Sequence, residues 1–151
     1  MSQSHANVLI HLVFSTKNRH PYLEDTELRK EMHKHLGGTS KTLNCPPIIV
    51  GGVEDHVHVL ARMARTIRIA DWVKELKRVT SIWASERDQQ VKEFKWQAGY
   101  GAFSVSQSEV QRVVKYIENQ VEHHKKMDFK SEYRKFLERH EIEYDERYVW
   151  E

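Results

Sequence analysis

The chain of 151 residues has little of what marks several classes of protein. Cys45 is its only cysteine, which excludes an intramolecular disulfide and a cysteine-rich zinc site. Its apolar runs stay short of the roughly eighteen residues that a membrane span needs, so no membrane partner is expected. The N-terminal segment lacks the basic stretch and the small-residue cleavage site of a signal peptide. We therefore expect a first strand there and, by default, a cytoplasmic location.

What the chain does contain is the composition of a soluble globular protein, with 39% hydrophobic and 30% charged residues. Its length suits one domain, and we expect residues 1–151 to form it, with a core at about 7–126 and a C-terminal tail at about 127–151. The net charge is only +2, but it is unevenly distributed. Residues 62–87 hold seven Lys or Arg against three Asp or Glu, whereas residues 128–151 hold five against eight. The basic middle indicates a surface that meets an anion, with ordinary solvated helix faces as the alternative.

The hydrophobic pattern predicts the order strand, helix, strand, strand, helix, strand, followed by two more helices. The predicted strands are 7–17, 45–55, 56–63 and 100–105, the helices are 24–43, 68–87, 106–126 and a shorter one near 129–140, and 143–150 is extended. The Gly37-Gly38 pair is expected to end the first helix or to interrupt it.

This order is the split βαβ, or ferredoxin-like, pattern. The predicted fold is therefore α+β, with an antiparallel sheet, helices on one face and a C-terminal helical tail. Such a sheet leaves its other face open for a ligand or a partner. RNA-recognition modules share the topology, so an RRM-like protein that binds nucleic acid without cutting it is one alternative.

The stretch GGVEDHVHVLARM, residues 51–63, places two histidines one residue apart in a segment that otherwise reads as a buried strand. Because side chains alternate along a strand, His56 and His58 point to one face while Val57 and Val59 point to the other. The two imidazoles lie about 7 Å apart along the strand at ~3.3 Å per residue, which suits two ligands of one metal ion. The H-x-H pattern is common, so it does not identify a metal site by itself.

The predicted helix 106–126 carries a second group of polar residues. Tyr116 and Gln120 are four residues apart, so on a continuous helix they share a face. Valine and isoleucine neighbours supply the apolar stripe, and Tyr116 and Gln120 lie at its edge on a basic helix. A phenol and an amide in that position indicate a site, with a core tyrosine as the alternative.

The pairing of EDHVHVL with a downstream VVKYIENQ resembles the single-tyrosine HUH transposases of small bacterial insertion sequences, the insertion sequence 200/605 family. The segments HLVFSTKNRHPYL and WQAGYGAFSVS are similar to that family as well, and the resemblance covers residues 7 to about 126. It implies a DNA transposase that cleaves and rejoins single-stranded DNA at hairpin-bearing element ends through a 5′-phosphotyrosine intermediate. A domesticated relative that cuts repeated palindromes in its host chromosome is a further alternative.

The resemblance also implies a role for each matched residue. His56 and His58 are the metal ligands, Gln120 is the third ligand and Tyr116 is the nucleophile. The implied cofactor is a divalent ion, Mg²⁺ or Mn²⁺, which suits imidazole and amide ligands. Family members act as homodimers in which the tyrosine helix of one subunit can complete the site of the other, so a homodimer with its tyrosine in trans is expected.

Contacts to the DNA backbone are expected from the basic residues. The candidates are Lys17, Arg19, Lys74, Lys77 and Arg78. His123 and His124 are expected to be bystanders that favour a helix C-terminus.

A metal hydrolase that activates water is another alternative, but it needs a further ligand. Only Glu54 and Asp55 are close in sequence, and Asp55 points away from His56 if the strand already includes it.

Overall fold

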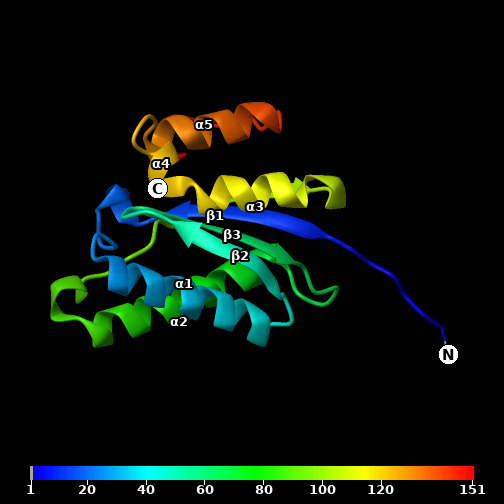
Figure 1. The fold of residues 1–151 in the computed structure, drawn as a ribbon, viewed down its shortest axis with the longest axis horizontal. Helices are drawn as coiled ribbons and strands as arrows, with labels where there is room; N and C mark the ends of the chain where they lie inside the picture. The colour runs from blue at the N-terminus through cyan, green and yellow to red at the C-terminus, as the bar shows by residue number, and fades with distance from the viewer. Residues whose placement is uncertain (1) are drawn as a thin grey trace.

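The computed structural model describes residues 2–151, which form a four-stranded antiparallel sheet with helices packed on it (Figure 1). The strand order is β2-β3-β1-β4, which confirms the predicted ferredoxin-like arrangement. The strands are β1 (Leu9–Ser15), β2 (Pro47–Gly52), β3 (His56–Arg62) and β4 (Gly101–Val105). Among residues 2–151, no helix is long and apolar enough to cross a membrane.

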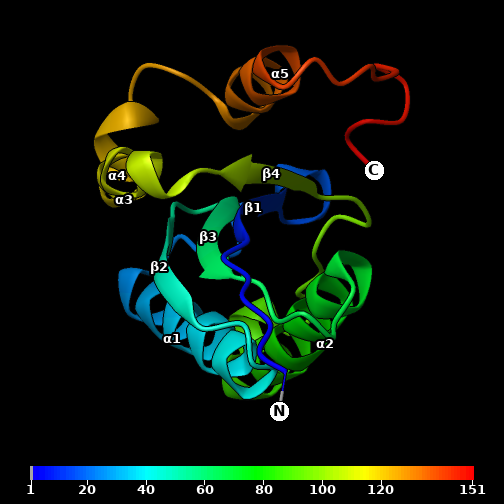
Figure 2. The same cartoon turned by 90° about the vertical axis from the view of Figure 1, so that its right-hand side faces the viewer.

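Helices α1 (Thr26–Thr42) and α2 (Ile69–Arg87) cover one face of the sheet (Figure 2). Asp25 caps α1 by accepting hydrogen bonds from the backbone N–H groups of the first turn. The expected interruption at Gly37-Gly38 is wrong, because α1 continues through both glycines. Apolar side chains from both helices and the facing side of β1 and β3 form the main core. The largest buried members on the helices are Leu28, Met32, Leu36, Trp72 and Leu76.

The C-terminal part of the chain packs on the second face of the sheet, which the predicted topology leaves open (Figures 1 and 2). Helix α3 (Val110–Glu118) packs on β2 and β3, and α4 (Gln120–His123) follows it. Helix α5 (Phe129–Arg139) lies over β1 and β4, where its aromatic side chains pack on Val13 and Phe103. His56, His58 and Leu60 of β3, which project from this face of the sheet, are therefore buried.

Two predicted segments differ from the structure. The expected continuous helix 106–126 is divided into a 3₁₀ turn at Gln107–Glu109, then α3 and α4, with the break at Asn119. The C-terminal segment 143–150, expected to be extended, folds into turns in which Tyr148 and Val149 donate backbone hydrogen bonds to the Asp145 carbonyl.

The strand register decides which side chains meet α3 and α5. Val57 and Val59 point into the core beneath α1 and α2. His56 and His58 point to the opposite face, where β1 pairs Ser15 with His56 and Val13 with His58. The alternation that the sequence predicted for these four residues of β3 is thus observed.

Candidate active site

The two histidines of β3 are fully buried and face the helices of the second face. Their ring centroids are 5.1 Å apart. The Nδ1 atom of His56 lies 2.7 Å from Asp55 Oδ1, and Nδ1 of His58 lies 2.8 Å from Nε2 of His11. These contacts fix both rings so that each Nε2 atom faces the same buried space.

The position of Asp55 corrects an expectation. On a strand that already includes Asp55, alternation places its side chain on the face opposite His56. Strand β3 begins at His56, so Asp55 lies in the preceding turn and its carboxylate bends back to accept a hydrogen bond from the neighbouring imidazole. It therefore orients His56 through Nδ1 instead of facing away from it.

Tyr116 and Gln120 reach the histidine pair from α3 and α4. The break at Asn119 means that they do not share one continuous helix, but the Gln120 amide still lies 3.4 Å from the Tyr116 carbonyl oxygen. Gln120 is buried, and its Oε1 lies 3.1 Å from Nε2 of His56. The structure thus brings together the four residues that the sequence named for catalysis and metal binding.

A fifth residue, Glu132 of α5, lies between these groups. Its Oε1 is 3.1 Å from Nε2 of His58 and 3.3 Å from Nε2 of His56. Its Oε2 accepts a hydrogen bond from the Tyr116 hydroxyl. The sequence contained a signal for it, because Phe129, Tyr133 and Phe136 define an apolar helix stripe and Glu132 lies on that stripe.

His124 also belongs to the site, so its expected role as a surface bystander is wrong. Its Nε2 lies 3.1 Å from Glu132 Oε2. Together, His56, His58, His124 and Glu132 offer ligand atoms that all lie within 4.8 Å of one another. His123, which was expected to be a bystander too, lies with its Nε2 3.3 Å from the Tyr116 hydroxyl. Both histidines follow the helix break at Asn119, and both lie within 3.3 Å of Glu132 Oε2.

The cluster strongly perturbs its own acid–base groups. Burial disfavours the charged form of His56, but hydrogen bonds to Asp55 and Glu132 outweigh it and raise the pKa of this imidazole to about 9. For His58 burial dominates and lowers the pKa. Burial favours a higher pKa for Glu132, but the surrounding histidines outweigh it and hold the pKa of this carboxyl well below the usual range. Burial and Glu132 together raise the pKa of Tyr116, so this residue is a neutral phenol near pH 7.

The donor set fits a hard divalent cation. Imidazole nitrogen, amide oxygen and carboxylate oxygen are ligands that Mn²⁺ accepts, and Mg²⁺ favours the oxygen donors. The buried carboxylate supplies the negative charge that a cation needs. As a ligand, His56 gives up the Nε2 proton that it donates to Gln120 and Glu132 here.

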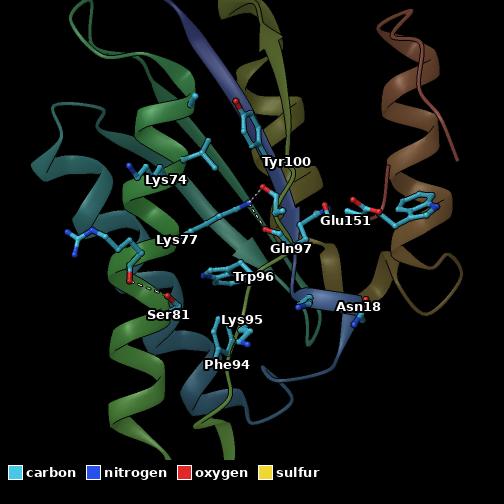
Figure 3. Close-up of a pocket in the computed structure, with 16 residues that line it drawn as sticks. Asn18, Lys74, Lys77, Ser81, Phe94, Lys95, Trp96, Gln97, Tyr100 and Glu151 are labelled. Carbon is cyan, nitrogen blue, oxygen red and sulfur yellow. Dashed lines mark hydrogen bonds between the residues drawn. The ribbon is translucent and has the colours of Figure 1, made fainter. Parts of the chain in front are cut away.

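The basic residues expected to contact DNA lie elsewhere, around a cavity of about 760 Å³ between α2 and the segment that precedes β4 (Figure 3). Lys17, Lys74, Lys77 and Arg78 line it. Lys74 and Arg78 are exposed, whereas the Lys77 ammonium donates to the carbonyls of three consecutive residues, 97–99. Arg19 is not among the lining residues, and it donates to the Trp150 carbonyl oxygen at 3.2 Å. The structure thus gathers four of the five candidates.

A second cavity, of about 600 Å³, opens at Tyr116 between β4, α3 and α5. Phe103 and Phe136 form one apolar part of its wall and stack on each other with ring centroids 5.2 Å apart. Arg112 and Arg139 add positive charge to the wall. The cavity connects Tyr116 with a basic, partly aromatic surface.

Comparison with protein-family models identifies a family for this chain. The family model described as "Transposase IS200 like" matches residues 4–120, which include both histidines of β3, Tyr116 and Gln120. Glu132 and His124 lie beyond the matched range. No curated protein matches the chain.

Two solved structures share the fold. The first is a crystal structure of a protein from Deinococcus radiodurans R1 assigned as a transposase, with 24% identity, a TM-score of 0.64, and coverage of 80% of this chain and 98% of that chain. The second is a REP-associated tyrosine transposase bound to a REP hairpin, with 14% identity, a TM-score of 0.59, and coverage of 82% of this chain and 74% of that chain. At these identities the likeness supports the fold alone.

Proposed function

The chain belongs to the IS200-like transposase family, and from this premise we propose that it cleaves and rejoins single-stranded DNA through a covalent bond to Tyr116. One observation carries the proposal. The Tyr116 hydroxyl, the His56–His58 pair and the Gln120 amide converge within a single chain on one buried point. A tyrosine beside a potential metal site is an arrangement that favours phosphoryl transfer to a phenol.

In the proposed cleavage step, the Tyr116 oxygen forms a bond to a backbone phosphorus atom. The bond from that phosphorus to the 3′ oxygen breaks, and the 3′ oxygen leaves as a hydroxyl after taking a proton from water. The Tyr116 proton goes to one of the two groups within reach of the hydroxyl, Glu132 and His123. The product is a 5′-phosphotyrosine, and attack by another 3′-hydroxyl reverses these bond changes and rejoins the strand.

His56, His58 and Gln120 would hold the divalent ion. When bound, the ion polarises a phosphoryl oxygen and neutralises the charge that grows during the step. Asp55 and His11 keep the two imidazoles aimed at this position.

The two cavities are suited to the DNA strand. The exposed cations Lys17 and Lys74 would contact backbone phosphates in the first cavity, where Trp96 and Tyr100 also line the wall. The second cavity would admit the strand to be cut, since it opens at Tyr116. A hairpin is the proposed substrate shape, because a protein of the same fold was solved bound to a REP hairpin.

The test is cleavage of single-stranded oligonucleotides that cover both strands of the DNA flanking the coding sequence. We expect some of them to be cut in Mn²⁺ or Mg²⁺, with complete loss of cutting in EDTA or with His56→Ala protein. The same sequences as duplexes should stay intact. Full cleavage in EDTA, or equal cleavage of duplexes, contradicts the proposal. Binding without cleavage under all conditions supports the RRM-like alternative.

A further inference from the structure

Helix α5 places a carboxylate inside the site although it lies outside the residues that match the family. One side of α5 is buried through Phe129, Tyr133, Phe136 and Leu137, which hold the helix on β1 and β4. Glu132 lies on the same side, and its side chain is only 2% exposed. The packing of the aromatic residues therefore fixes where this carboxylate points.

The partners of Glu132 are unusual for a structural ion pair. Burying a charged carboxylate is strongly unfavourable unless its partners compensate. Among the described residues, its ion-pair partners are all histidines, and its further contacts are the Gln120 amide and the Tyr116 hydroxyl. These partners are themselves groups of the site, so the position of Glu132 is explained by the site and not by the anchoring of α5, which its aromatic residues provide.

We propose that Glu132 is a ligand of the divalent ion through Oε1 and holds the Tyr116 hydroxyl through Oε2. This inference rests on the proposed function. Neighbouring ligands of an octahedral ion with bonds near 2.1 Å lie about 3 Å apart. The ligand atoms here have that spacing: Glu132 Oε1 lies 3.1 Å from His58 Nε2 and 3.3 Å from His56 Nε2. A third pair, Gln120 Oε1 and His56 Nε2, is 3.1 Å apart.

The two oxygens of Glu132 have different surroundings. Oε1 faces the histidine pair of β3, whereas Oε2 faces Tyr116 and His124. His124, 3.1 Å from Oε2, fixes the rotation of the carboxylate. The ion and the nucleophile are thereby connected through one side chain, and the C-terminal helix becomes part of the active site.

The test is Mn²⁺ binding to the full chain, measured by titration calorimetry without DNA. We expect Glu132→Gln to weaken Mn²⁺ binding by at least tenfold, because it removes the only negative ligand of the proposed set. Glu132→Asp keeps the charge but withdraws the oxygen, so it should weaken binding as well. Glu138→Gln is the matched control, since Glu138 is exposed on the same helix, and it should bind Mn²⁺ as the unchanged chain does.

The outcomes separate this inference from the proposed function. If His56→Ala loses Mn²⁺ binding while Glu132→Gln and Glu132→Asp retain it, the Glu132 assignment is wrong and the histidine site stands. If His56→Ala binds Mn²⁺ normally, the metal site of the proposed function fails. Unfolding temperatures measured in EDTA check for a structural role, which predicts a lower value for Glu132→Gln together with unchanged Mn²⁺ affinity.

Discussion

Histidines of this chain occupy very different environments, and the environment decides what each can do. His56 and His58 have both ring nitrogens engaged by groups of the site. His33 of α1 is partly buried, and its buried Nε2 atom has no hydrogen-bond partner among the described residues. The first two are placed for ligand binding, whereas His33 is a neutral side chain at the edge of the core.

His33 gives a prediction about acid stability. Burial, with smaller effects of Arg29 and His58, lowers the pKa of His33 to about 4. Since the unfolded imidazole takes up its proton near pH 6.5, the unfolded state binds more protons between these two values. The contribution of His33 to the free energy of unfolding is therefore fully present above about pH 6.5. It is lost as the pH falls toward 4, and the loss is about 2 kcal/mol at pH 4.5.

The measurement is the free energy of unfolding in urea at pH 7.5 and pH 4.5. His33→Leu removes the titrating group, so this variant should lose about 2 kcal/mol less than the unchanged chain between the two pH values. His35→Leu, at an exposed position of the same helix, is the control and should follow the unchanged chain. An equal loss in His33→Leu and the unchanged chain contradicts the prediction.

At the scale of single residues, the sequence identified those site residues that stand at a characteristic spacing along a strand or a helix. The alternation of β3 placed His56 and His58 on one face, and the spacing of four placed Tyr116 near Gln120. It missed Glu132 and His124, because their positions depend on how α5 and the helix break pack against the sheet. A glutamate on an apolar helix stripe was a usable signal for the first of these.

Among the elements, α3 is the one whose position matters most for the proposed nucleophile, Tyr116. It meets β2 where Gly51 leaves room for Ile117, the residue that follows Tyr116. A Cβ atom on Gly51 would lie 2.7 Å from Ile117 Cγ2 and 3.0 Å from the Ile117 carbonyl oxygen. The close contact between strand and helix thus requires glycine.

Gly51→Ala should therefore push α3 away from the sheet. We expect a loss of about 1–3 kcal/mol in the free energy of unfolding, as for other overpacked positions, and slower DNA cleavage because Tyr116 moves with its helix. Gly38→Ala is the control, since a Cβ atom there meets nothing within 4 Å, and alanine in a helix should stabilise by about 0.5–1 kcal/mol. Equal effects of the two substitutions, measured by urea unfolding, contradict this account of the helix contact.

The elements themselves were predictable where the pattern was strong. The strands follow from short runs of apolar residues, and the first two helices follow from apolar periodicity, because each of these helices buries one face in the core. The break at Asn119 was not predictable from the same pattern, since the residues on both sides keep helical spacing. The apolar pattern also could not predict that α5 packs on the second face of the sheet, because this packing depends on contacts between residues distant in sequence, such as Phe136 with Phe103.

For the whole molecule, the main question is whether one chain makes a complete site. The expected homodimer with its tyrosine in trans stays a prediction. In the single chain, α3 packs on β2 and β3 of its own sheet, and Tyr116 lies with its ring centroid 5.8 Å from that of His58. A single chain therefore brings all groups of the proposed site together.

Mixing two inactive variants distinguishes the arrangements. His56→Ala and Tyr116→Phe proteins are combined, allowed to exchange subunits, and assayed on single-stranded hairpin DNA. If the tyrosine acts in cis, each site of a mixed dimer keeps one mutation and the mixture stays inactive. Restored cleavage would instead place the tyrosine in trans, because one site of each mixed dimer then has its intact histidine pair and its intact tyrosine.

The most direct test of the central claim is to map the covalent bond between protein and DNA. A cleavage reaction stopped midway should leave DNA attached through its 5′-phosphate to Tyr116, identified by mass spectrometry of the digested protein. Tyr116→Phe keeps the ring in place and should bind the same DNA without forming an adduct. An adduct on Tyr100, which lines the basic cavity, or cleavage with no tyrosine adduct at all, would contradict the account.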